Sequence, residues 1–317
     1  MTDDTFEHMR PRLMGIAYRM LGTLSEAEDA VQDVYIKWSE NSAILRAGNS
    51  SAWLVKVCTN RCLDILKSAH RKRMRYVGPW LPEPLHTTTD GSPEDMALNA
   101  SSLSFAFLAL LERLTPKERA AFLLREVFDY DYADVSEALG ISAVSCRQLV
   151  SRAKVHIDHD VVRSHASEEK KTELLGAFRL AVETGNTRQF EKMLSRSIQL
   201  HADGGGQVVA AQSVVCGAAD ITALIRLGLH RVWAGKTMQM VEVNGDPGLV
   251  LWDGSKVFGC VSLDISNSGQ IQQIFVVRNP DKLIQLHREI TVEANTGAVF
   301  DSPTVTKKGA SSFEQQS

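Results

Sequence analysis

Residues 76–86 read Tyr-Val-Gly-Pro-Trp-Leu-Pro-Glu-Pro-Leu-His, and this proline-rich stretch divides the chain. Each proline fixes its own φ angle, lacks a backbone donor and favours an extended conformation in the residue before it, so no helix can run through the stretch. Trp80, Leu81 and Leu85 are nevertheless too apolar for a solvated spacer. We therefore expect residues 76–98, called the strap below, to lie extended with these side chains docked on the flanking folded parts.

The bulk composition favours a cytoplasmic protein of two or three domains. The chain has 317 residues and a net charge of −3. It shows neither a signal-peptide core nor the run of about 18 apolar residues that a membrane span needs, so we expect no membrane partner. Its five cysteines are scattered and lack the second pair or nearby histidine of a zinc site, so we expect small buried apolar residues and no metal. They are Cys58, Cys62, Cys146, Cys216 and Cys260.

Residues 1–75 carry apolar side chains at helical spacing in three runs. Ser25 and Glu28 form a capping box that is expected to open the second run, and a polar loop at 39–51 precedes the third. The third run ends in a cluster of basic residues near Trp80, which favours a site that follows a phosphate backbone. The alternative is that these cations only stabilise the dipole of their helix.

Residues 99–163 end in a helix-turn-helix pattern. A capping box at 115–118 opens one helix, and farther on a short helix, the turn residue Gly140 and a second helix at 143–157 have helix-turn-helix spacing. Cys146 and Leu149 are expected to face inward. An ordinary helical hairpin shares this pattern, but arginine and glutamine can read base edges, and hydroxyl and basic groups suit phosphates. The candidate residues are Ser145, Arg147, Gln148, Ser151, Arg152 and Lys154.

Beyond residue 168 the pattern changes from helices to strands. Helices are expected at 168–184, 188–194 and 218–229, and strands at 238–243, 249–252, 257–265 and 271–277. Helices followed by an antiparallel meander predict an α+β cone. His201 and Asp203 could form an acid/base pair there, although a His-x-Asp at a strand end is more often structural.

Four motifs, in order, resemble those of an extracytoplasmic-function (ECF) sigma factor, the small bacterial sigma-70 type built from regions 2 and 4. Residues 27–34 resemble the polymerase-docking helix, 53–75 the segment that opens the minus-ten element, 114–119 the start of region 4, and 145–154 the recognition helix for the minus-35 element. The implied polymerase-binding residues are Glu28, Asp29, Gln32 and Asp33. The implied DNA-binding residues of region 2 are Asn60, Arg61, Asp64, Lys67, Arg71, Lys72 and Arg73.

The same resemblance implies the partners. They are core RNA polymerase, through its β′ coiled coil and β flap, and promoter DNA at the minus-ten and minus-35 elements. A loop at 43–51 would receive a base flipped out of the melted strand. Because residues 1–165 hold slightly more acidic than basic residues, we expect weak DNA binding without polymerase.

The last third resembles a SnoaL-like domain of the nuclear-transport-factor-2-like superfamily. In the ECF subgroup that carries this domain, it is thought to replace a separate anti-sigma factor by contacting region 2 and the linker. Gln207 stands where that subgroup usually has Lys or Arg. The motifs that carry the resemblance, and the implied regulatory residues, are Trp80-Leu81-Pro82-Glu83-Pro84, Asp203-Gly204-Gly205-Gly206 and Asn279-Pro280-Asp281-Lys282-Leu283.

We therefore expect region 2 at 1–75, the strap at 76–98, region 4 at 99–163, the SnoaL-like domain at 168–290 and a flexible tail at 291–317. The expected function is that of a sigma factor whose own C-terminal domain adjusts its activity, with no catalytic residue and no cofactor. Two other classes stay open. One is a helix-turn-helix regulator that binds DNA alone and senses a small ligand in the SnoaL-like pocket; the other is an enzyme fused to a DNA-binding module.

Overall fold

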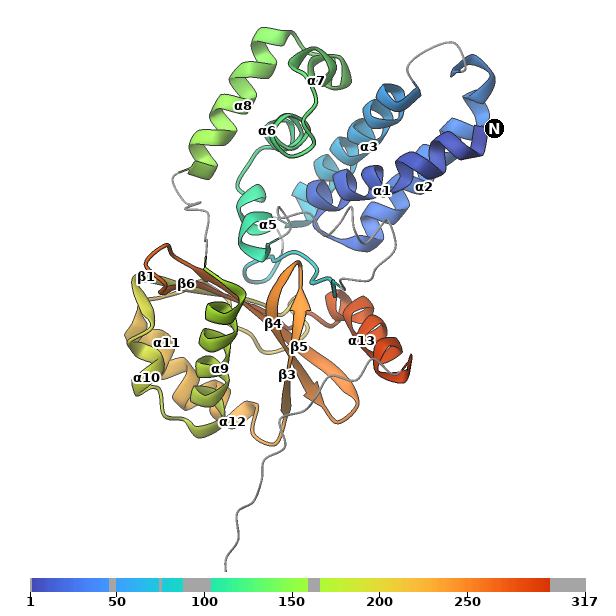
Figure 1. Ribbon diagram of the computed structural model, residues 1–317. Coiled ribbons are helices and arrows are strands. Elements are labelled where there is room, and N and C mark those ends of the chain that lie inside the picture. The colour runs from blue at the N-terminus through green and yellow to red at the C-terminus, as the bar shows by residue number, and fades with distance from the viewer. Residues whose placement is uncertain (1, 46–49, 74–75, 88–103, 159–165, 297–317) are drawn as a thin grey trace, which may run out of the picture.

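The computed structural model describes residues 2–45, 50–73, 76–87, 104–158 and 166–296. A helical N-terminal part lies on one side of the strap, and a sheet covered by helices lies on the other (Figure 1). This arrangement confirms the expected combination of helical modules with a C-terminal α+β domain. None of the helices in the described ranges is long and apolar enough to cross a membrane.

The first helical module consists of α1 (Thr2–Leu21), α2 (Leu24–Leu45) and α3 (Ser50–Arg73). Gly22 turns the chain after α1 with a φ of 78°, and Thr23 Oγ1 donates to Glu26 Oε2 at 3.0 Å. The expected capping box at Ser25 and Glu28 is therefore wrong. A glycine with positive φ allows the new helix to begin at once, so Ser25 already lies inside α2.

The prediction of a polar loop at 39–51 is also wrong over most of that range. α2 continues to Leu45, and α3 begins at Ser50. No glycine or proline occurs between Ser39 and Leu45, so nothing in that sequence ends the helix. Residues 46–49, which belong to the loop proposed to receive a flipped base, lie outside the described residues.

The second helical module comprises α5 (Phe105–Leu111), α6 (Pro116–Phe122), the π-helical η1 (Leu123–Val127), α7 (Tyr132–Leu139) and α8 (Ala143–Asp158). The capping box before α6 is present: Glu118 N donates to Thr115 Oγ1 at 3.4 Å, and Thr115 N donates to Glu118 Oε2 at 3.1 Å. Gly140, with a φ of 63°, turns the chain between α7 and α8. The helix-turn-helix prediction is thus confirmed.

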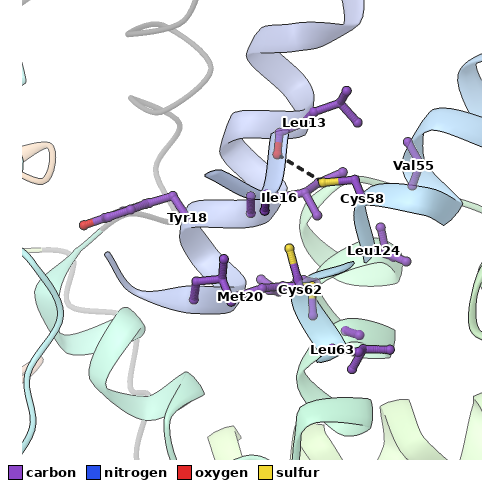
Figure 2. Packing of buried hydrophobic residues seen from close by; sticks show 14 of the residues in the cluster. Leu13, Ile16, Tyr18, Met20, Val55, Cys58, Cys62, Leu63 and Leu124 are labelled. Atoms are coloured by element: carbon purple, nitrogen blue, oxygen red, sulfur yellow. Dashed lines mark hydrogen bonds between the residues drawn. The ribbon is translucent and has the colours of Figure 1, made fainter. Parts of the chain in front are cut away.

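The two helical modules share one hydrophobic core. Within it, Cys58 and Cys62 of α3 lie beside α1, where Cys58 Sγ approaches Leu13 O at 3.7 Å (Figure 2). Cys146 and Cys260 are also buried, as expected, but Cys216 is exposed because it lies on the short edge strand β2 (Val215–Cys216). No His, Cys, Asp or Glu cluster suited to a metal ion occurs among the described residues.

The C-terminal domain is a six-stranded sheet with helices packed against it. The strand order is β2-β1-β6-β5-β4-β3, in which β3 to β6 form the expected antiparallel meander and β1 runs parallel to β6. Its remaining elements are α9 (Glu168–Thr184), α10 (Arg188–Glu191), β1 (Leu194–Asp203), α11 (Ala218–Leu224), the π-helical η2 (Ile225–Leu229), α12 (His230–Val232), β3 (Thr237–Val243), β4 (Asp246–Asp253), β5 (Lys256–Ile265), β6 (Ile271–Val277), the 3-10 helix η3 (Pro280–Leu283) and α13 (Ile284–Thr296).

Several expected boundaries in this domain differ from the structure, among them the start of β4, which lies at Asp246 and not at 249. The helix expected to reach Leu194 ends at Glu191, because Leu194 starts a strand whose Ile198, Leu200 and Ala202 alternate into the core. At the other end, α13 continues through Thr296, past residue 291, where the tail was expected to begin.

Each face of the sheet carries its own apolar cluster. On one face, aromatic rings fill the interior: Phe178 of α9 contacts Phe190 and Trp233, with ring centroids 5.6 and 6.5 Å apart. On the other face, Phe275 of β6 packs against Phe105 of α5 at 5.7 Å, and Leu81 of the strap joins that cluster. The second helical module and the strap therefore close one face of the C-terminal sheet.

Candidate functional site

The outer face of α8 is polar and open. Cys146 is buried and Leu149 is half-buried, as the helix-turn-helix pattern requires. Lys154 pairs with Glu126 of η1 at 2.8 Å, and Arg152 pairs with Glu118 of α6 at 3.6 Å. Ser145 is exposed beside an open depression, and the residues that line this depression are Arg147, Gln148, Ser151 and Arg152. These side chains can donate hydrogen bonds to phosphates and to base edges.

On α3, several candidate DNA-binding residues already have partners inside the protein. Asn60 Nδ2 donates to Ala138 O of α7 at 3.1 Å, so region 2 touches the helix-turn-helix directly. Arg61 pairs with Asp33 of α2 at 2.5 Å. Lys67 pairs with Asp64 at 2.8 Å on the helix surface. Arg71, Lys72 and Arg73 belong to the last turn of α3, and their side chains lie outside the described part.

The acidic face of α2 is available to a partner. Glu28, Asp29 and Gln32 are exposed, and Asp33 is half-buried beside Arg61. Ala27, Ala30 and Val31 on the opposite side are buried in the shared core. The spacing that separates these two faces is what the sequence predicted.

The strap is fixed to the C-terminal domain by Asp203, which has no exposed surface. Asp203 Oδ1 accepts from Tyr76 Oη at 2.6 Å, and Oδ2 accepts from Leu81 N at 2.9 Å. Lys282 Nζ donates to Oδ2 at 2.8 Å, donates to Leu81 O, and lies 3.9 Å from the centroid of the Trp80 ring. A buried charge pair is stable only when its remaining hydrogen-bonding groups are also satisfied, and here the strap satisfies them.

The glycines after Asp203 and the Asn279 turn are packed together. Gly205 has a φ of 63°, and a Cβ at this position would lie 2.6 Å from the Asn279 side chain. Asn279 accepts from Asp281 N at 3.1 Å, which caps η3, and donates to Tyr76 Oη at 2.8 Å. Gln207, which stands in place of the usual basic residue, donates to Asp281 Oδ2 at 2.6 Å. A neutral amide therefore makes this contact.

The strap is also fixed to region 2. Glu83 N donates to Gly22 O at 2.8 Å, and Glu83 Oε2 accepts from Leu24 N at 2.7 Å at the start of α2. Tyr18 Oη of α1 donates to Glu83 O at 2.7 Å and accepts from Asn244 Nδ2 at 2.8 Å. Region 2, the strap and the β3–β4 turn thus share one buried polar network.

The indole of Trp80 packs on Gly22, where a Cβ would meet its Cη2 atom at 2.5 Å. Farther along, Leu85 N donates to Asn244 Oδ1 at 3.2 Å, while its side chain lies in the core of the helical modules. Trp80, Leu81 and Leu85 therefore lie between region 2 and the C-terminal domain, where the sequence placed them. Their regulatory role stays a prediction.

His201 and Asp203 do not form an acid/base pair. Asp203 is held by Lys282, Tyr76 and Leu81 N, as described above. His201 stacks on Phe275 with ring centroids 5.5 Å apart, and its burial, with the Arg113 charge, lowers its pKa to about 4. At neutral pH this imidazole is uncharged and packed against an apolar ring, which fits a structural role.

Sequence reasoning missed Tyr18, Tyr76 and Asn244. Asn244 was recognised only as part of a turn, although its backbone has a φ of 54° and its side chain is buried. Tyr18 is fully buried on α1 and looked like an ordinary core residue. No local signal marks these residues, because their partners lie between 65 and 226 positions away in the chain.

The protein has two helical modules, one of which is a helix-turn-helix, and a C-terminal sheet domain holds the strap between them. This is the architecture of a bacterial initiation factor. Comparison with known families agrees: residues 5–72 match Sigma-70 region 2, and residues 104–157 match Sigma-70, region 4.

Relatives extend the match to nearly the whole chain. ECF RNA polymerase sigma factor SigJ of Mycobacterium tuberculosis is 31% identical over 287 residues, which are 87% of this chain and 91% of SigJ. Probable ECF RNA polymerase sigma factor SigI of the same species is 28% identical and covers 89% of this chain and 94% of SigI. The crystal structure of M. tuberculosis SigJ superposes with a TM-score of 0.72 at 29% identity, over 89% of this chain and 98% of that one.

The chain belongs to the ECF family of RNA polymerase sigma factors. Its C-terminal domain has the SnoaL-like fold of that relative. Sigma factors bind core RNA polymerase and promoter DNA, so the candidate surfaces above can be assigned within that framework.

Proposed function

We propose that this sigma factor docks on core polymerase through α2, reads promoters through α3 and α8, and is restrained by its own C-terminal domain through the strap. The polymerase contact would be made by Glu28, Asp29 and Gln32, with Asp33 positioned by Arg61. Their exposure on one face of α2 supports a contact with the basic side of a coiled coil, the β′ coiled coil of the core enzyme. Region 4 would bind the β flap.

Promoter recognition would use both helical modules. Arg147 and Gln148 of α8 would read base edges of the minus-35 element, and Ser145, Ser151 and Arg152 would contact phosphates; their exposure on α8 supports this proposal. Asn60 of α3, proposed for the minus-ten element, is bonded to Ala138 O instead. Its use in DNA binding would require α3 to separate from α7, so the compact form is proposed to be the restrained one.

The observation that carries the proposed restraint is the buried Asp203. Its carboxylate binds Tyr76 and Leu81 of the strap together with Lys282 of its own domain. Releasing the strap would leave the Asp203–Lys282 pair without these hydrogen bonds, which makes release costly. Since a domain of the same chain performs this restraint, we propose that no separate anti-sigma factor is needed.

Run-off transcription with core polymerase tests the proposal. Asp203→Asn keeps the shape of the side chain but removes the charge that binds Lys282, so the strap should loosen and transcription from a cognate promoter should rise at least severalfold. Asp253→Asn is the matched control because it removes only the exposed pair with Lys236 on the same domain. Equal transcription from wild type, Asp203→Asn and a chain ending at residue 160 would refute the restraint. Absence of any transcription would refute the sigma-factor assignment.

A further inference from the structure

Glu83 is a carboxylate of the strap enclosed between the two halves of the protein. Only 6% of the surface of Glu83 is exposed. Its backbone N–H donates to Gly22 O at 2.8 Å, its carbonyl accepts from Tyr18 Oη at 2.7 Å, and its Oε2 accepts from Leu24 N at 2.7 Å. None of these bonds can persist when the strap leaves region 2.

The carboxylate occupies the N-terminus of α2. The first backbone N–H groups of a helix have no partner within it, and an acceptor there stabilises the helix. Leu24 N, in the first turn of α2, donates to Glu83 Oε2 at 2.7 Å, and Thr23 Oγ1 donates to Glu26 Oε2 at 3.0 Å. The strap therefore provides the acceptor for the helix that carries Glu28 and Asp29, the proposed polymerase contacts.

Charged groups from every neighbouring element act on this carboxylate. Lys282 of η3 favours its ionised form, whereas Glu289 of α13 and Glu28 of α2 oppose it. On α1, buried Tyr18 donates to the Glu83 carbonyl and Arg19 lies next to Tyr18 along the helix. Burial dominates, and it raises the pKa of Glu83 from its ordinary 4.5 to about 7. The docked carboxylate thus exchanges a proton near neutral pH.

We propose that Glu83 makes the attachment of the strap to region 2 proton-dependent: the docked strap takes up a proton that the released strap gives up. Rising pH then favours release and falling pH favours docking. The consequence for transcription rests on the proposed restraint, but the docking equilibrium itself does not.

The direction and the size of the pH effect on strap docking follow from the difference between the pKa of Glu83 in the docked form and in the released form. The docked form has the raised pKa, so its stability relative to the released form is fully present below pH 4.5 and falls as pH rises through about 7. With a pKa of 4.5 in the released strap, the ratio of released to docked protein should increase about tenfold between pH 6 and pH 8. Above pH 8 the ratio should level off.

Amide hydrogen exchange of the full chain measures this ratio directly. The N–H groups of Leu24 and Glu83 form hydrogen bonds between the strap and region 2, and both lose these partners when the strap leaves region 2. Their protection factors, which correct for intrinsic exchange chemistry, should fall about tenfold between pH 6 and pH 8 in wild type. In Glu83→Gln, whose amide oxygen can still accept from Leu24 N, they should stay constant and exceed the wild-type values at pH 8.

Two further variants keep the test decisive. Glu289→Gln removes a like charge that raises the pKa of docked Glu83, so the fall in protection should be smaller and should level off at lower pH. Asp264→Asn is the control: burial raises the pKa of Asp264 to about 6, but this residue of β5 makes none of the strap bonds, so the wild-type pH dependence should remain. A fall that is the same in wild type and Glu83→Gln, or absent from wild type, would overturn the proposal. Because hydrogen exchange measures only the docking of the strap, this test of the proposal does not depend on any transcription assay.

Discussion

Lys282 is a cation with almost no exposed surface, and its environment explains how a lysine can be buried. Its side chain is 7% exposed, its Nζ donates to Asp203 Oδ2 and to Leu81 O, and the Trp80 ring covers it at 3.9 Å. An anion, a carbonyl and an aromatic face together replace the water that the ammonium loses. Two of these three groups, Leu81 O and the Trp80 ring, belong to the strap, so only Asp203 stays with Lys282 when the strap is released.

Replacing this lysine tests that balance. Lys282→Met should lower the free energy of unfolding by about 3–5 kcal/mol, because Asp203 is left as an unpaired buried charge. Urea unfolding followed by circular dichroism measures the loss. The double variant Lys282→Met/Asp203→Asn should recover part of it, since no charge then stays buried. If the two substitutions were simply additive, the pair would not be coupled and the argument for a charge-based latch would fail.

At the scale of elements, the α1–α2 turn is where region 2 receives the strap. Gly22 has a φ of 78°, and a Cβ there would come within 2.5 Å of Trp80. Gly140, in the turn of the helix-turn-helix, has a similar φ of 63° but nothing within 4 Å of its missing Cβ. The two turns therefore share a left-handed backbone that would strain any residue with a side chain, and they differ in whether another element packs on them.

This pair of glycines gives a matched comparison. Gly140→Ala should cost roughly 1–2 kcal/mol of stability from the left-handed backbone alone. Gly22→Ala should cost on the order of 1 kcal/mol more, because the new methyl group displaces the indole of Trp80. Thermal unfolding of both variants measures the difference in stability. A red shift of the tryptophan emission maximum in Gly22→Ala alone would report the displaced ring. Equal losses would mean that Trp80 adapts without cost.

Elements whose signals are local could be predicted from the sequence. The box at Thr115, the turn at Gly140 and the alternation in β3 to β6 each depend on neighbours within a few residues. Strand β1 was not among the predicted strands, because it runs parallel to β6, so its partner lies some 70 residues away and leaves no turn signal. The start of α2 was misplaced for a similar reason, since its acceptor, Glu83, comes from the strap.

The residues of the candidate site likewise fall into those that local sequence patterns predict and those that they do not. The faces of α2 and α8 follow from helical spacing, so Glu28 and Arg147 were identified correctly as exposed. The apolar strap residues indicated that something covers them, but not that Asn244 and Asp203 do so, because those contacts join segments far apart in the chain. Resemblance to a family pointed to Asp203, whereas nothing in the sequence pointed to Asn244.

At the scale of the whole molecule, the strap is the contact that determines how the helical modules and the C-terminal domain are arranged. Leu81 is 2% exposed in the cluster on the sheet, and Trp80 lies between Gly22 and Lys282. Phe105 of α5 adds one further contact to that face of the sheet. Removing the two strap side chains leaves each half with its own core, so the halves should separate without unfolding.

Small-angle scattering of Trp80→Ala/Leu81→Ala should therefore give a larger radius of gyration than wild type, with unchanged helix content by circular dichroism. Val209→Ala is the control, because that side chain is 88% exposed and its loss should leave the radius as it is. The same double variant should transcribe more strongly with core polymerase, since the separated modules can reach both promoter elements. A larger radius without a change in transcription would mean that the strap sets the shape of the free protein but not its activity. An unchanged radius would mean that the remaining contacts, among them Phe105 on the sheet and the Tyr18–Asn244 bond, hold the halves together without these two side chains.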